Sequence, residues 1–206
     1  MIEKFCIEGL KKVNKCDIDR IANIATLAFL DDPSSIYLFD KNLNYSTLYE
    51  FYTILYKALF EKMSIFVDSD CCAFLIVCSI KNSEVSLFDY IKHGGLKVIL
   101  RHGLGLVIRS LQYENNNTKI RRKFIDESAW YVMQFGVTPS KQGLGIGSSL
   151  MKPFLSWLDN NKLDCYLETL KFKNVDMYRH YGFELKEEYN SPDKKQKQYA
   201  LLRNSH

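Results

Sequence analysis

The chain has 206 residues, of which 47% are hydrophobic and 14% aromatic, which is enough for one sizeable core and predicts one domain. Its formal charge of 28 − 24 = +4 is too small to indicate a nucleic-acid-binding protein and suits an anionic small ligand equally well. Its six cysteines form no CxxC pair, and no run approaches the roughly 18 apolar residues of a membrane helix. We therefore expect reduced thiols, no metal site, no membrane contact and, since the N-terminus lacks a signal-peptide core, a cytoplasmic location.

The first third of the chain predicts two helices and a hairpin. A strand is expected over residues 2–10, and Asp17 is a helix cap for an amphipathic helix that starts at Ile18 and stops or turns at "DDP". A second helix is expected over residues 46–63. The runs "SIFVDSD" and "CCAFLIVCSI" are rich in β-branched and aromatic residues, and the polar turn at 68–70 between them predicts a hairpin.

The middle of the chain, residues 83–123, predicts two or three short helices interrupted by glycines. Gly103 and Gly105 mark a helix break, because no strand precedes them. The polar, basic stretch "ENNNTKIRRKF" predicts a loop or a helix start that faces solvent.

The last third has the clearest pattern. "AWYVMQFGV" predicts a buried central strand, and "TPSKQGLGIG" predicts a loop that opens the helix "SSLMKPFLSWLDNN", bent near Pro153. "LDCYLETL" predicts another strand, and "NVDMYRHY" a short helix that ends at Gly182. "FELKEEY" and "KQYALLRN" predict a closing pair of strands.

The glycine loop between the central strand and its helix predicts an anion site. Helix N-termini offer unpaired N–H groups and partial positive charge, and glycine lets phosphate oxygens approach the backbone. The dinucleotide pattern GxGxxG is excluded because Ser148 stands three residues after Gly145. The pattern GxxxxGK[ST] is excluded because no lysine follows Gly143, Gly145 or Gly147.

The stretch from Gln142 to Gly147 resembles the Q/R-x-x-G-x-G/A motif of the GCN5-related N-acetyltransferase (GNAT) superfamily. Upstream, "WYVMQFGVTP" resembles the fourth strand of that family with its V-x-P end. Downstream, "YLETLKFKNVDMYRHYGFEL" resembles the fifth strand, an asparagine and the Y-x-x-x-G-F signature. The resemblance covers residues 129–187. Taken together, these motifs resemble those of a broad microbial and fungal subgroup of the family whose substrates are mostly undefined.

This resemblance implies an α/β (α+β) GNAT fold: a mixed, mostly antiparallel sheet with splayed fourth and fifth strands and helices on both faces. It implies one domain over residues 1–206, with an acetyl-CoA-binding core at 129–187 and acceptor-binding helices at 17–63 and 83–123. Acetyl-CoA would be the co-substrate, with no metal. The partner would be a small-molecule or peptide amine, with no nucleic acid or membrane, and the protein would be a monomer or homodimer.

The implied activity is acetyl transfer from acetyl-CoA to a primary amine by direct attack in a ternary complex; the alternative is a non-catalytic acyl-CoA-binding sensor. Tyr178 would protonate the leaving thiolate, or else pack in the core. Glu168 would be the base, directly or through water, or else a charge that is exposed or paired with Lys171. The coenzyme site would contain Phe135, Gly136, Val137, Gln142, Gly143, Leu144, Gly145, Ile146, Gly147, Ser148, Asn174 and Tyr178, with Asn174 alternatively a helix cap.

Overall fold

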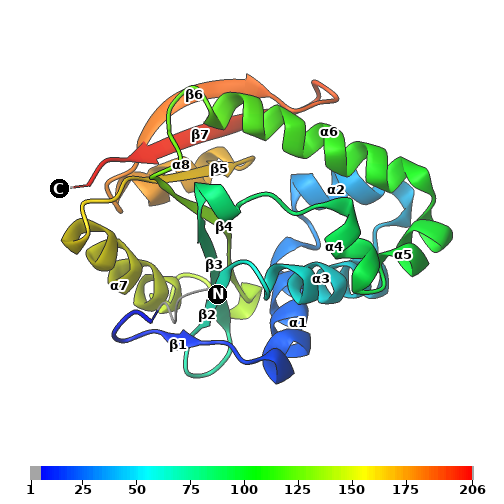
Figure 1. The fold of residues 1–206 in the computed structure, drawn as a ribbon, viewed down its shortest axis with the longest axis horizontal. Helices are drawn as coiled ribbons and strands as arrows, with labels where there is room; N and C mark the ends of the chain where they lie inside the picture. Colours follow the sequence, from blue (N-terminus) through cyan, green and yellow to red (C-terminus); the bar gives the residue numbers. More distant parts are fainter. Residues whose placement is uncertain (1–5, 206) are drawn as a thin grey trace.

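The computed structural model describes residues 6–205 and has a single seven-stranded sheet with helices on both faces (Figure 1). The strands are β1 (Lys11–Lys12), β2 (Ser64–Val67), β3 (Ala73–Ser79), β4 (Trp130–Val137), β5 (Cys165–Thr169), β6 (Glu184–Asn190) and β7 (Lys197–Arg203). The longer helices are α1 (Ile18–Phe29), α2 (Pro33–Phe39), α3 (Tyr45–Leu59), α4 (Leu87–Lys92), α5 (Gly95–His102), α6 (Leu104–Arg121), α7 (Ile146–Asn160) and α8 (Phe172–Arg179). The strand order is β1-β2-β3-β4-β5-β7-β6.

Each face of the sheet carries its own hydrophobic core, because successive strand residues point to opposite sides. On β3, Phe74 and Ile76 pack with buried side chains of α1, α3 and α6, whereas Leu75 and Val77 pack with those of α7 and α8. Figure 1 shows α7 on one side of the strands and α1 to α3 on the other. The expected mixed sheet with helices on both faces is confirmed.

The sheet opens between β4 and β5, the only parallel pair among the strands of residues 6–205. These strands pair at Trp130–Cys165 and Tyr131–Tyr166 and then separate. Past that point β4 stays paired with β3 as far as Val137, while β5 stays paired with β7 as far as Thr169. One edge of β4 and one edge of β5 therefore face each other across a gap, which is the splay that the sequence predicts.

The first strand and the "DDP" segment add detail that the sequence pattern does not give. Residues 6–10 form no strand, β1 is confined to 11–12, and residues 2–5 of the expected strand lie outside the described chain. The "DDP" segment begins a helix, because Asp32 accepts the N–H of Ser34 and Pro33 occupies the first turn of α2. No described helix is long and apolar enough to cross a membrane.

The polar stretch expected as a loop or helix start instead forms the last turns of α6, over residues 114–121. Asn117 and Arg121 are buried there. The Asn117 Oδ1 accepts hydrogen bonds from the Tyr189 hydroxyl and from Gln198 Nε2, each at 3.1 Å. Partners on β6 and β7 satisfy these polar groups, so tertiary contacts override a polar sequence pattern.

Candidate functional site

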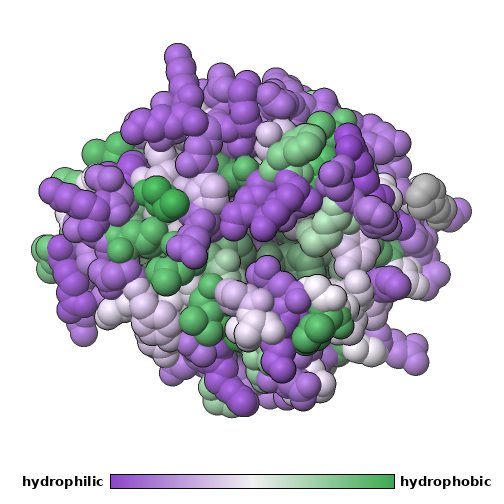
Figure 2. Space-filling model, turned by 180° about the vertical axis from the view of Figure 1, so that it is seen from behind, coloured by the Kyte–Doolittle hydropathy of each residue, from purple (hydrophilic) through white to green (hydrophobic). Residues whose placement is uncertain are grey.

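A cavity of about 410 Å³, here called the splay cavity, lies where β4 and β5 separate. Its walls come from the end of α1, the end of β4, the glycine loop, the start of α7, and α8. It brings together these predicted residues: Phe135, Gly136, Val137, Gln142, Gly143, Gly145, Ile146, Gly147, Ser148, Asn174 and Tyr178. Two predicted residues are not in its lining: the side chain of Leu144 is 67% exposed to solvent, and Glu168 lies deeper in the molecule. The face drawn in Figure 2 is hollowed near its centre.

The glycine loop has the geometry of an anion site. Gly143 and Gly145 have φ values of +79° and +78°, a region that L side chains rarely adopt, so the turn requires glycine at both positions. Within residues 6–205, the N–H groups of Gly143, Leu144 and Gly145 donate no hydrogen bond. They lie at the N-terminus of α7, where the helix dipole adds partial positive charge.

Two other glycines are needed for close packing. A Cβ on Gly147 would stand 2.7 Å from the Phe135 ring, so glycine lets the first turn of α7 lie against β4. A Cβ on Gly136 would stand 2.6 Å from the Phe74 ring and 3.1 Å from that of Phe29. Gly147 therefore fixes the distance between loop and strand.

Three lysines that the sequence did not assign to the coenzyme site line the same cavity: Lys141, Lys171 and Lys173. The Lys171 Nζ pairs with the Asp32 carboxylate at 2.9 Å, which ties β5 and α8 to the start of α2. Because Asp32 also lines the cavity and offsets the charge of Lys171, the net positive charge that favours a multiply charged anion comes from Lys141, Lys173 and the α7 N-terminus. Because Lys171 and Lys173 follow β5 and begin α8, only the folded arrangement places them opposite the glycine loop.

Tyr178 and Asn174 reach the cavity from α8. The Tyr178 side chain is 6% exposed, and burial raises the pKa of its phenol above the usual value, so the hydroxyl is protonated at neutral pH. Asn174 does not cap α8; Lys171 occupies the cap position, and the Asn174 Nδ2 donates to the Thr169 hydroxyl at 3.1 Å. Tyr181 also lines the cavity, and its hydroxyl forms a hydrogen bond with the Ser148 hydroxyl at 2.8 Å.

Glu168 is buried on the other face of the splay, against α6. Its Oε2 accepts a hydrogen bond from the Tyr131 hydroxyl at 2.7 Å, and its Oε1 lies 3.8 Å from Arg121 Nη1. Burial raises the pKa of this carboxyl to about 7, against the opposing effects of the Arg121 charge and the Tyr131 hydrogen bond. The predicted alternative, a charge that is exposed or paired with Lys171, is wrong, because the Glu168 side chain is buried and Lys171 pairs with Asp32.

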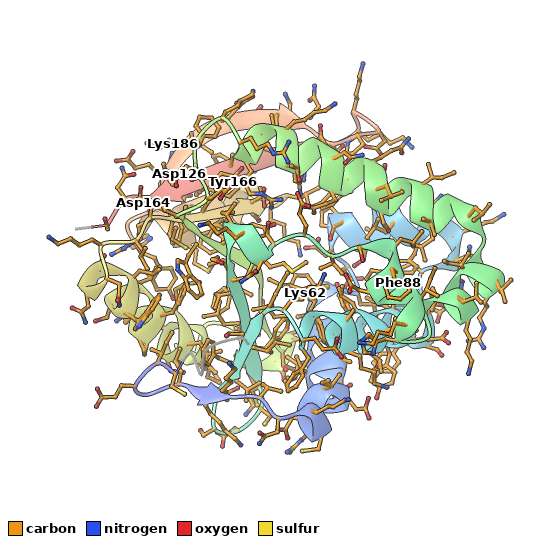
Figure 3. All side chains as sticks on the ribbon, in the orientation of Figure 1. Lys62, Phe88, Asp126, Asp164, Tyr166 and Lys186 are labelled. Atoms are coloured by element: carbon orange, nitrogen blue, oxygen red, sulfur yellow. The ribbon has the colours of Figure 1, made fainter. Side chains whose placement is uncertain are left out.

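The cluster around Glu168 has unmet hydrogen-bonding capacity. Arg121 Nη1, Glu168 Oε1 and the hydroxyl of Tyr166 are buried and have no hydrogen-bond partner within the described chain. Tyr166, labelled in Figure 3, lies on β5 two residues before Glu168. Since buried polar groups are nearly always satisfied, these atoms are candidate partners for a water or a polar group of a ligand.

The two predicted proton-transfer residues pack on opposite faces of the sheet. Glu168 contacts residues of the α6 face, and Tyr178 packs in the α7–α8 core. The pairing of β4 with β5 ends at Tyr131 and Tyr166, so Met133 and Glu168 each stand two residues past the point where the sheet opens. Among residues 6–205, no group of three or more His, Cys, Asp or Glu side chains is arranged to hold a metal ion.

Sequence comparison relates part of this chain to a known family. Residues 87–183 match the sequence model of the acetyltransferase (GNAT) family. An uncharacterised N-acetyltransferase of Schizosaccharomyces pombe is 34% identical over 58 residues, which is 28% of this chain and 24% of the relative. The matched stretch thus spans about a quarter of that relative.

Solved structures of the same fold are similar over nearly the whole chain. The "histone acetyltransferase HPA2 and related acetyltransferase" of Corynebacterium glutamicum has a TM-score of 0.64 at 14% identity, with 96% of each chain covered. The polyamine N-acetyltransferase of Drosophila melanogaster has a TM-score of 0.60 at 12% identity, covering 95% of this chain and 98% of that one. Residues 87–183 thus carry the match to the GNAT family, and the described chain, with its splayed β4 and β5 and its glycine loop, is similar in fold to known acetyltransferases.

Proposed function

We propose that this protein is an N-acetyltransferase that moves an acetyl group from acetyl-CoA to a primary amine by direct attack in a ternary complex. The observation that carries the proposal is the splay cavity, in which the glycine loop, the lysines, Asn174 and Tyr178 converge. A phosphate site alone would fit many ligands, whereas a phosphate site continued along an open strand edge fits a long phosphorylated thioester.

The donor would lie along the cavity from its phosphates to its thioester. The free N–H groups of Gly143, Leu144 and Gly145 and the neighbouring lysines would bind the pyrophosphate. The edge of β4 from Phe135 to Val137, which β5 leaves unpaired, offers backbone donors and acceptors to the amide groups of the pantetheine arm. Asn174 would add a side-chain contact at the thioester end.

The transfer requires the amine nitrogen to lose protons and the leaving thiolate to gain one. Glu168, with a pKa of about 7, would take a proton from the ammonium group, directly or through a water in the unsatisfied cluster. The neutral amine nitrogen then attacks the thioester carbon, and the carbon–sulfur bond breaks as the nitrogen gives its second proton to water and the new amide forms. Tyr178 would give its phenolic proton to the leaving thiolate and regain one from water, so the products are the N-acetylated amine and free coenzyme A.

The test is release of coenzyme A thiol from acetyl-CoA in the presence of a panel of primary amines. We expect Tyr178→Phe to lower kcat by about tenfold or more, within the usual range for a general acid, with little change in coenzyme affinity measured by calorimetry. Tyr199→Phe, a buried tyrosine outside the splay cavity, is the matched control and should keep its kcat. If the Tyr178→Phe variant is as active as the parent, its acid role is wrong. If acetyl-CoA binds and no amine releases thiol, the protein is an acyl-CoA sensor.

A further inference from the structure

A second cavity of about 220 Å³, here called the helical cavity, lies among α2 to α6 and β4. Its lining is almost entirely apolar and includes Phe51, Leu55, Val98, Ile99, Leu106 and Met133. Lys62, labelled in Figure 3, pairs with Asp89 at 2.5 Å and holds α4 at the end of α3, which stabilises one wall. This cavity does not share a residue with the lining of the splay cavity.

The helical cavity is linked to the proposed base by residues of β4 and α6. Met133, two residues after the last β4 residue that pairs with β5, lines it. Glu114 also lines it, and its Oε1 accepts a hydrogen bond at 2.8 Å from Arg121, the same guanidinium that faces Glu168. Helix α2 connects the two cavities as well, since its cap Asp32 lines the splay cavity and its Leu38 lines the helical one.

We infer that the helical cavity binds the apolar body of the acceptor, so that the substrates are primary amines attached to an aromatic ring or a short aliphatic chain. This inference rests on the proposed acetyl transfer and names its acceptor class. The amine would point toward Glu168, where the carboxylates of Glu168 and Glu114 favour an ammonium group.

The size of the cavity selects the apolar group. An apolar cavity of about 150 Å³ in a protein interior holds one benzene molecule. A cavity of about 220 Å³ therefore accommodates one phenyl ring with a short linker. Tyr90 lines the cavity, and its buried hydroxyl has no hydrogen-bond partner within residues 6–205, so a ring with one polar substituent would also be accepted.

The same lining disfavours polyamines and amino acids. A second ammonium or a carboxylate at the far end of the substrate would be buried among apolar side chains without a partner of opposite charge. Burial of an unpaired charge is strongly unfavourable, so substrates with two charged ends should be poor. The discrimination should appear mainly in KM, because the apolar body contributes binding energy away from the reacting atoms.

The experiment compares 2-phenylethylamine with putrescine in the thiol-release assay, for the parent protein and two variants. Val107→Trp places a ring in the helical cavity, whereas Ile108→Trp, one residue along α6 with a side chain 54% exposed, serves as the matched control. We expect kcat/KM for 2-phenylethylamine to exceed that for putrescine by about tenfold or more. Val107→Trp should raise KM for 2-phenylethylamine by a similar factor, while Ile108→Trp leaves it unchanged, and neither should alter coenzyme A affinity.

The outcomes separate the acceptor inference from the proposed activity. Turnover of putrescine that equals or exceeds that of 2-phenylethylamine, or an unchanged KM in Val107→Trp, overturns the inference and leaves acetyl transfer standing. If no amine is turned over, binding of 2-phenylethylamine is measured instead by ligand-observed NMR with coenzyme A present. Binding to the parent but not to Val107→Trp supports the cavity assignment. Absence of binding to the parent overturns it.

Discussion

The perturbed carboxyl of Glu168 makes a quantitative prediction about pH. If Glu168 must be ionised to accept the amine proton, the parent loses activity as pH falls through about 7, while Glu168→Gln lacks this ionisation. The free amine fraction also changes with pH, but it changes equally for both proteins. The ratio of their kcat/KM values therefore isolates the ionisation of Glu168.

The size of the effect follows from the pKa. A group with a pKa of about 7 is roughly 10% ionised at pH 6 and roughly 90% ionised at pH 8, whereas one at its usual 4.5 would be almost fully ionised at both. We expect Glu168→Gln to lower kcat/KM by about a hundredfold at pH 8. The ratio of parent to variant should then fall by about tenfold between pH 8 and pH 6.

The assay is thiol release at saturating acetyl-CoA and low amine from pH 5.5 to 9, with coenzyme affinity checked at both ends. A ratio that stays constant over this range would contradict a base with a raised pKa. A constant ratio near one would remove Glu168 from the chemistry altogether.

Three further predictions concern stability and donor binding. Because burial raises the Glu168 pKa in the folded state, the folded chain binds an extra proton between about pH 4.5 and 7, so its free energy of unfolding should fall as pH rises through that window. Glu168→Gln should flatten this slope in urea titrations, and an equal slope in both proteins would refute it. Gly136→Ala should lower the free energy of unfolding by about 1–3 kcal/mol, since its Cβ would meet the Phe74 ring, and a loss below about 0.5 kcal/mol would contradict the packing argument. Lys173→Glu should weaken acetyl-CoA binding by about tenfold at low salt and less at high salt, whereas the control Lys152→Glu, exposed and outside the splay cavity, should not.

The sequence predicts those parts of the site whose residues lie close together in the chain. Gly143 and Gly145 need positive φ within a strand–loop–helix segment, and the motif that carries them is continuous in the chain. Glu168 is different, because its burial depends on Arg121 at the end of α6, 47 residues earlier (168 − 121 = 47). The end of α6 was itself missed, since its polar residues are satisfied only by partners on β6 and β7.

The lysines of the splay cavity were missed for a related reason. Lys141 and Lys173 are exposed and read as ordinary surface charges in the sequence. Lys141 directly precedes the glycine loop, whereas Lys173 reaches the same cavity from α8, which follows β5. A pattern of residue types cannot supply that arrangement, whereas the topology of the sheet does.

Acetyl transfer itself is tested most directly with acetyl-CoA labelled on the acetyl group and 2-phenylethylamine as acceptor, followed by mass spectrometry of both products. The proposed mechanism predicts that the label appears on the amine nitrogen in amounts equal to the free coenzyme A released, and that Tyr178→Phe slows both equally. Tight binding of acetyl-CoA with no label on this amine or on any other primary amine would contradict the enzyme assignment and leave a coenzyme-binding protein.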